Sequence, residues 1–228
     1  EHDLIKSNRV KSINNVLVIG DLHEPFCLDQ YLYFCIEQYV RYNCTEVVFI
    51  GDIIDNHYSS YHETNADGMG GADELELAIK RIARWYDAFP EATIIVGNHD
   101  RMVMRKAQTS AIPSKWIKSY KEVLEVPGWS FVERYEKDGV QYIHGEGGQA
   151  FTKCRADLMN TVQGHLHTLC GCQHFVGRKF RVWGMQTGCG IDHESYAMAY
   201  AKYGKKPAIG CGVILNNGKL PINLLMEL

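Results

Sequence analysis

Three short apolar runs in the first hundred residues each end at a glycine that is followed at once by acidic, amide or imidazole side chains. The runs are 15–19, 47–50 and 93–96, and the motifs that follow them are GDLH at 20–23, GDIID at 51–55 and GNHD at 97–100. Apolar stripes of helical spacing over 29–42 and 72–89 separate the runs. Strands that alternate with helices imply a largely parallel sheet, and such sheets bind ligands at the carboxyl ends of their strands. The pattern therefore predicts an α/β fold that gathers these motifs at one edge.

The second half of the chain predicts more and shorter strands. Helical stretches are expected near 102–122 and 149–159, strands at 129–135, 140–144 and 161–164, and hairpin turns at 137–139, 177–178 and 217–218. Two further polar motifs, HG at 144–145 and GHLH at 164–167, again follow apolar runs. We therefore expect a second, mixed or antiparallel sheet packed on the first, with helices outside.

Length and composition are those of an ordinary globular chain, and we expect one domain over residues 1–228. No apolar run approaches the roughly 18 residues of a membrane span, and nothing at the N-terminus reads as a secretory signal. The eight cysteines fall partly inside apolar stripes, such as Cys35 and Cys211, which favours free thiols over disulfides. These features together predict a cytoplasmic location.

The five motifs supply a set of donors that suits a pair of divalent cations. Asp52 has two oxygens and is the natural bridging ligand, while mixed oxygen and nitrogen donors without thiolate suit Mn²⁺, Zn²⁺, Fe or Co²⁺ better than Ca²⁺. Two cations roughly 3.5–4 Å apart can clamp a phosphoryl group between its attacking and leaving oxygens. The candidate ligands are Asp21, His23, Asp52, Asn98, His144, His165 and His167.

In this order, the motifs D-x-H, GD, GNH[DE], H and GHxH resemble the calcineurin-like metallophosphoesterase superfamily over residues 20–167. The resemblance implies a four-layer α/β/β/α sandwich with the dinuclear site at the strand carboxyl ends. It implies that one metal is held by Asp21, His23, Asp52 and His167, and the other by Asp52, Asn98, His144 and His165. It also favours Mn²⁺, with Zn²⁺, Fe, Co²⁺ and Ni²⁺ as alternatives.

The same resemblance implies a mechanism. A hydroxide that bridges the metals would attack phosphorus in line, and His99 would protonate the leaving oxygen or stabilise the transition state. Asp100 would orient His99 through a carboxylate–imidazole hydrogen bond.

The substrate is less well specified. Ser/Thr protein phosphatases typically read GDxVDRG where this chain reads GDIIDNH, which argues against that branch. The compact form resembles phosphoesterases that bacteriophages and bacteria often encode. We rank nucleotide-like small molecules first, an Mre11/SbcD-like nuclease or nucleic-acid end-processing enzyme second, and a non-catalytic metal-binding scaffold third. The oligomeric state is not readable from the sequence.

Charge and several polar residues leave alternatives open. Residues 1–150 hold 15 Lys/Arg against 23 Asp/Glu, and residues 151–228 hold 9 against 4, so a basic C-terminal third could attract a polyanion. Arg101 and Arg105 could contact phosphate or be ordinary helix-surface charges. Asp55 fits a turn or a ligand-supporting position better than a ligand. The loop 56–71, with His57 and His62, could line the substrate site or be an uninvolved surface loop.

Overall fold

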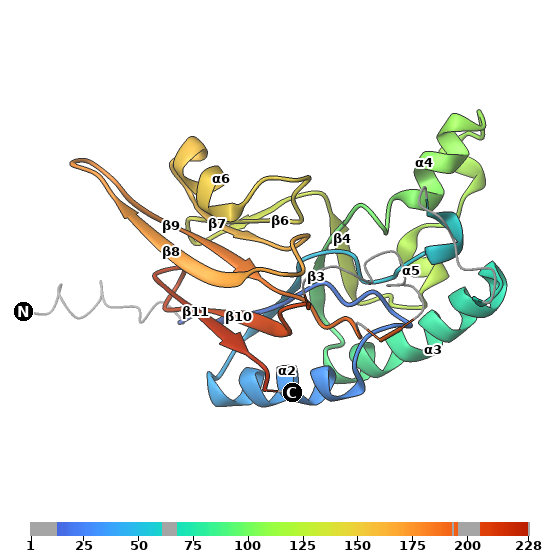
Figure 1. Ribbon diagram of the computed structural model, residues 1–228, viewed down its shortest axis with the longest axis horizontal. Helices are drawn as coiled ribbons and strands as arrows, with labels where there is room; N and C mark the ends of the chain where they lie inside the picture. The colour runs from blue at the N-terminus through green and yellow to red at the C-terminus, as the bar shows by residue number, and fades with distance from the viewer. Residues whose placement is uncertain (1–12, 61–67, 193, 196–205, 228) are drawn as a thin grey trace, which may run out of the picture.

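The structure, a computed structural model, describes residues 13–60, 68–192, 194–195 and 206–227. Two sheets lie face to face with helices on both outer sides, as the sequence predicts (Figure 1). The fold is therefore a mixed α/β sandwich with four layers.

The first sheet has the order β11-β10-β1-β2-β3-β4. Its four consecutive strands β1, β2, β3 and β4 run parallel to one another. The hairpin of β10 and β11 adds to β1 in antiparallel fashion. Two long helices, α2 and α3, cover the outer face of this sheet (Figure 1). The elements are β1 (Val16–Ile19), α2 (Asp29–Arg41), β2 (Glu46–Phe49), α3 (Gly71–Ala88), β3 (Ala92–Ile95), β4 (Trp129–Val132), β10 (Gly210–Leu215) and β11 (Leu220–Leu225).

The second sheet has the order β5-β6-β7-β9-β8, with parallel strands at its centre and antiparallel strands at both edges. Helix α6 packs on its outer face against β7 and β9. The elements are β5 (Tyr135–Lys137), β6 (Val140–Ile143), α6 (Ala150–Asp157), β7 (Asn160–Gln163), β8 (Cys170–Val176) and β9 (Arg181–Thr187).

Alternation along the strands builds two cores. In β1, Leu17 and Ile19 face α2 and α3, whereas Val16 and Val18 face the second sheet. Successive side chains of a strand point to opposite faces, so a strand that is apolar throughout must be covered on both sides. This is why the short run at 15–19 specifies a central strand of a sandwich.

One expected strand, 129–135, is divided. Residues up to Val132 form β4 at the edge of the first sheet, and β5 begins at Tyr135 at the edge of the second. The exposed Glu133 and Arg134 carry the chain between the sheets. A period-two pattern indicates strand conformation but cannot indicate which sheet each half joins.

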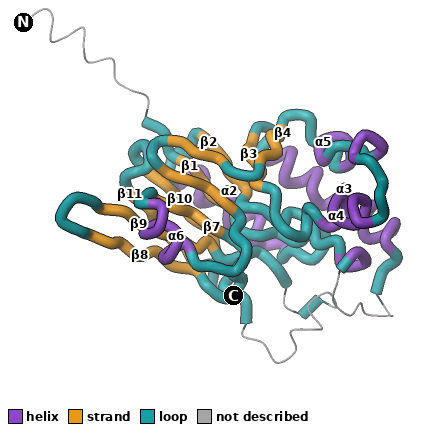
Figure 2. The backbone as a smooth tube through the Cα atoms, turned by 90° about the horizontal axis from the view of Figure 1, so that it is seen from above, coloured by secondary structure: helices purple, strands orange, loops and turns teal. Residues whose placement is uncertain are grey.

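Two short helices project from the end of the molecule opposite the β8–β9 hairpin (Figures 1 and 2). They are α4 (Met102–Thr109) and α5 (Tyr120–Val123), and a single 3₁₀ turn, Ser114–Trp116, lies between them. All eight cysteines carry free thiols, as expected. Within the described residues, no helix is long and apolar enough to cross a membrane.

Candidate metal centre

Five strand ends bring the polar motifs together between the two sheets. Asp21, Asp52 and Asn98 follow β1, β2 and β3 of the first sheet. His144 and His165 follow β6 and β7 of the second. All five strands are parallel within their sheets, so their carboxyl ends open toward the same region.

A first group of donors contains Asp21, His23, Asp52 and His167, with one ligand atom of each within 4.8 Å of every other. His167 Nε2 lies 3.2 Å from Asp21 Oδ2 and 3.0 Å from His23 Nε2. His23 Nε2 lies 3.7 Å from Asp52 Oδ2. These four residues are those that the family resemblance implies as ligands of one metal.

A second group contains Asp52, His144 and His165. The side-chain oxygen of Asn98 lies within hydrogen-bond distance of both histidines of this group. His144 Nε2 lies 3.1 Å from Asp52 Oδ2 and 2.9 Å from Asn98 Oδ1. His165 Nδ1 lies 2.8 Å from the same Asn98 oxygen. Asp52 Oδ2 thus lies between the two groups, as a bridging ligand would.

Three residues of the site have left-handed backbone conformations. His23, Asp52 and His165 have φ values of 53°, 48° and 68°, which are uncommon for residues other than glycine. Two glycines, Gly97 and Gly164, let the carboxylates of Asp52 and Asp21 lie directly on the backbone. A Cβ atom at these positions would lie 2.1 Å from Asp52 Oδ1 and 2.3 Å from Asp21 Oδ1.

The structure corrects the role expected for Asp100. Its carboxylate accepts hydrogen bonds from the backbone N–H groups of Asp52 (2.9 Å), Ile53 (3.1 Å) and Gly97 (2.8 Å). The His99 ring instead uses Nδ1 to donate to the backbone oxygen of Asp55 at 2.6 Å. Asp100 therefore ties the GDIID and GNHD loops together and does not hydrogen-bond the His99 imidazole, because its side chain points toward the loop amides.

Asp55 takes the orienting role instead. Its Oδ1 accepts a 2.6 Å hydrogen bond from His23 Nδ1, which leaves His23 Nε2 to face the first group. Through its backbone oxygen it also holds His99. Carboxylates that fix the tautomer of a ligating histidine are a common feature of metal sites. The sequence signal was weak, since Asp55 simply follows Asp52 by three residues in GDIID.

The carboxylates of the site raise the pKa values of two neighbouring histidines, so their charge favours cations at this position. Burial lowers the pKa of His144, but the charges of Asp52 and Asp21 outweigh it and raise that pKa to about 10. Burial opposes ionisation of Asp52, yet His144 lowers the pKa of this carboxyl. Burial also lowers the pKa of His99, and the charges of Asp52 and Asp55 raise it above the ordinary value.

The donor atoms fit divalent cations on geometric grounds as well. His144 donates through Nδ1 to the backbone oxygen of Ile50 at 3.0 Å, so Nε2 is the ring atom that would bind a metal in place of its proton. Nε2 faces the acceptor oxygens of Asp52 and Asn98. In addition, Asp21 Oδ1 is buried without a hydrogen-bond partner. Converging acceptors and an unpartnered buried carboxylate oxygen are stabilised when a cation lies among them.

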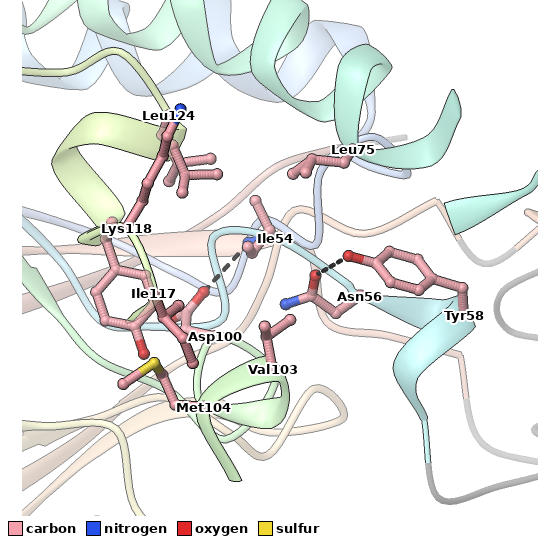
Figure 3. A pocket seen from close by; sticks show the side chains of 12 residues that line it. Ile54, Asn56, Tyr58, Leu75, Asp100, Val103, Met104, Ile117, Lys118 and Leu124 are labelled. Carbon is pink, nitrogen blue, oxygen red and sulfur yellow. Dashed lines mark hydrogen bonds between the residues drawn. The ribbon is translucent and has the colours of Figure 1, made fainter. Parts of the chain in front are cut away.

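Behind the GNHD loop lies an apolar cavity of about 140 Å³, which Figure 3 shows. Asp100 and Asn56 reach its wall from the loop side, and Leu75 and Val103 reach it from α3 and α4. Asn56 donates through Nδ2 to the backbone oxygen of His99 at 2.9 Å. The cavity thus backs onto the loop that carries His99.

Residues 56–60 and 68–71 of the loop expected at 56–71 belong to the described structure, and residues 57–59 contact α3. His57 is buried, and its backbone N–H donates to Glu74 Oε1 at 2.7 Å. His57 therefore lies beside α3. His62 lies outside the described residues. Arg101 and Arg105 line a hollow of about 380 Å³ together with Asn98 and His165, so both lie beside the donors.

The sequence matches the calcineurin-like phosphoesterase family over residues 15–177. No curated protein matches it significantly. Among solved structures, vacuolar protein sorting 29 of Cryptosporidium parvum is 15% identical, with 95% of this chain and 92% of that chain covered and a TM-score of 0.48. An archaeal phosphodiesterase is 14% identical, with 93% and 99% covered and a TM-score of 0.44. A Pseudomonas putida nuclease is 14% identical, with 91% and 87% covered and a TM-score of 0.40. Similarity at this level assigns no substrate.

The family match spans well over half of the chain, and this chain therefore belongs to the calcineurin-like phosphoesterases.

Proposed function

We propose that this chain hydrolyses nucleotide-type phosphate esters with the help of two divalent transition-metal ions, with Mn²⁺ as the first candidate. One observation carries the proposal. Asp52 Oδ2 lies 3.7 Å from His23 Nε2 and 3.1 Å from His144 Nε2, so a single carboxylate oxygen faces both groups of donors. A shared carboxylate between two imidazole-containing groups is the arrangement that a dinuclear centre needs.

The residues divide between the two ions. Asp21, His23 and His167 would hold one, Asn98, His144 and His165 would hold the other, and Asp52 would bridge them. When bound, two such ions supply charge that neutralises phosphate oxygens and make water a stronger nucleophile at neutral pH.

In this proposal His99 would act on the leaving group. Its Nδ1 is engaged by the Asp55 carbonyl, so Nε2 is the atom that can donate a proton to the departing oxygen. The ring packs edge-on against His23 at a centroid distance of 4.6 Å, which sets it beside the first group. Asp55 and Asp100 are positioning residues: Asp55 orients His23 and His99, and Asp100 holds the two loops.

The test is turnover of bis-p-nitrophenyl phosphate and p-nitrophenyl phosphate by metal-stripped protein refilled separately with Mn²⁺, Zn²⁺, Ni²⁺ and Mg²⁺. We expect metal-dependent cleavage, with two equivalents of metal per chain at saturation. Preference for the diester would establish a phosphodiesterase, and preference for the monoester a phosphatase or nucleotidase. Two bound ions without turnover of either ester would contradict hydrolysis and support a metal-binding scaffold.

Two variants separate the roles of ligand and proton donor. His99→Ala should keep two metals and lower kcat by about 10²- to 10⁴-fold, the usual contribution of a general acid. Asp52→Ala should lose metal. If His99→Ala lost metal as severely as Asp52→Ala, His99 would be a ligand and the assignment would be wrong.

A further inference from the structure

A basic segment, defined as residues 101–121, lies within the otherwise acidic stretch 1–150. It contains six of the 24 lysines and arginines and no acidic residue. It comprises α4, the 3₁₀ turn and the first two residues of α5, at the end of the molecule away from the β8–β9 hairpin (Figures 1 and 2). Four of its cations, Arg105, Lys115, Lys118 and Lys121, are exposed.

The basic segment is continuous with the metal centre. Arg101 and Arg105 line the inner hollow of about 380 Å³ that contains Asn98 and His165. The same two arginines line an outer hollow of about 540 Å³, which continues along α4 to Lys118. A chain-like ligand lying along this groove would therefore pass from the lysines to the metal ligands.

Three carboxylates also border the groove, and each is already engaged. Glu133 and Glu146 pair with Arg101 at 2.9 and 2.7 Å. Glu122 accepts hydrogen bonds from the backbone N–H and the hydroxyl of Ser119 at the start of α5. Arg101, Arg105 and Lys118 line the groove and match these three carboxylates in number. The other three cations of the basic segment, Lys106, Lys115 and Lys121, therefore give this surface an excess of positive charge, in a protein whose net charge is −3.

The basic segment also presents an exposed aromatic ring. Trp116 is 83% exposed, whereas the other three tryptophans of the chain are at most 3% exposed. It lies between Lys115 and Lys118, next to Ile117 in the wall of the outer hollow. Packing does not account for a tryptophan in this position, because only a small part of its surface is removed from water. An accessible indole among cations is the arrangement on which unpaired bases stack.

We propose that the basic segment binds single-stranded nucleic acid and delivers one of its phosphodiesters to the metal centre. The inference rests on the proposed function and names its substrate class. A free single strand offers what the surface requires: regularly spaced phosphates for the cations and an unpaired base for Trp116. An anionic membrane could also attract lysines and a tryptophan. The concave groove that leads into a phosphoesterase centre favours a strand over a membrane surface.

The proposal changes the order of the substrate candidates. Charge summed over residues 1–150 and 151–228 indicated that the C-terminal third is the basic part, whereas the basic surface beside the site is built from 101–121. Nucleic acid therefore moves ahead of small nucleotides.

The test compares a long substrate with a short one. The variant Lys115→Gln/Lys118→Gln/Lys121→Gln and the wild type are assayed with Mn²⁺ on a fluorescein-labelled 20-nucleotide oligothymidylate and on bis-p-nitrophenyl phosphate. We expect kcat/KM on the oligonucleotide to fall about tenfold or more, while the small diester changes less than twofold. The slope of log affinity against log salt should become shallower by about 2, since each phosphate contact on a single strand contributes about 0.7.

A matched control loses three exposed cations from the opposite end of the molecule. Arg178→Gln/Lys179→Gln/Arg181→Gln, at the β8–β9 hairpin, has the same net charge as the first variant and should behave as wild type on both substrates. Equal losses in the two triple variants would overturn the proposal, because only overall charge would then matter.

Trp116 provides a readout that does not depend on turnover. Oligothymidylate should quench the tryptophan fluorescence of the wild type but not of Trp116→Phe. Trp116→Ala should bind the strand roughly 5- to 150-fold more weakly, the range that corresponds to one stacked base.

The remaining outcomes separate the two proposals. Turnover of the small diester without any binding of oligonucleotide would refute the nucleic-acid site and leave the phosphoesterase intact. Binding of vesicles containing phosphatidylserine, but not of oligonucleotide, would refute it in favour of a membrane surface. Trp116 quenching by oligonucleotide without hydrolysis of either substrate would support the strand site and refute the proposed function.

Discussion

Gly97 is the position at which the structure makes its sharpest prediction about the metal centre. A Cβ atom there would lie 2.1 Å from Asp52 Oδ1 and 2.4 Å from the backbone nitrogen of Asp52. Cβ contacts under 3.0 Å are essentially never seen, so Gly97→Ala must push the Asp52 carboxylate away by roughly 1 Å. That carboxylate cannot simply turn, because Oδ1 accepts a 2.8 Å hydrogen bond from the His99 N–H and Oδ2 faces His144.

The expected magnitude follows from this displacement. Overpacking of this kind costs about 1–3 kcal/mol of folding stability. A displacement of about 1 Å at a catalytic centre costs roughly 10²-fold in turnover. We therefore expect Gly97→Ala to remain folded, to bind metal about 10- to 100-fold more weakly, and to lose about 100-fold in kcat/KM on bis-p-nitrophenyl phosphate.

The assay pairs metal titration by calorimetry with turnover, and circular dichroism checks the fold. Gly171→Ala is the matched control, since a Cβ atom there meets nothing within 4 Å. Gly164→Ala should weaken binding through the other carboxylate, because its Cβ would lie 2.3 Å from Asp21 Oδ1. Wild-type metal affinity and turnover in Gly97→Ala would refute the bridging position of Asp52.

Three further predictions concern groups around the site. Asp55→Asn removes the carboxylate that orients His23 and should weaken metal binding about 10- to 100-fold, measured by chelator competition. Arg81→Ala leaves Glu24, which is 2% exposed, without its ion pair and should lower the free energy of unfolding by about 3–5 kcal/mol in urea. Burial raises the pKa of Glu74 to about 7, so its ionisation destabilises the fold as pH rises from about 4.5 to 7. Glu74→Gln should therefore be more stable than wild type at pH 8. The difference in the free energy of unfolding should grow by at most about 1.4 kcal/mol per pH unit between pH 4.5 and 7, and it should vanish near pH 4.

Controls for these variants are available in the chain. Arg84→Ala removes an exposed pair with Asp29 and should cost less than about 1 kcal/mol. A similar loss in Arg81→Ala would contradict the importance of the buried pair. Metal affinity unchanged in Asp55→Asn would show that His23 is held by other contacts. An advantage of Glu74→Gln that was the same at pH 4 and pH 8 would exclude ionisation as its cause.

The predictable part of the site follows from strand direction. Side chains that come directly after parallel strands must meet at one edge, so Asp21, Asp52 and Asn98 could be grouped before any coordinates existed. The fold followed from the same strands, because stretches that are apolar at every position, such as 16–19 and 47–50, must be covered on both faces. The assignment of donors to two ions came from the family resemblance, and it remains a proposal that metal titration must test.

The tertiary structure decided the details that depend on backbone rotation and on distant neighbours. Asp100 looked like the partner of His99 because the two are adjacent, yet a tight turn after Gly97 sends the Asp100 carboxylate to the loop amides and leaves His99 to Asp55. Spacing along the chain fixes side-chain direction only inside regular helices and strands, where the period is known. Residues in the left-handed region, such as Asp52 with φ of 48°, break that period. The basic segment was missed for a related reason: charge acts over about 10 Å of space, so a sum over 150 residues conceals a run of six cations, two of which, Arg101 and Arg105, fold beside the metal ligands.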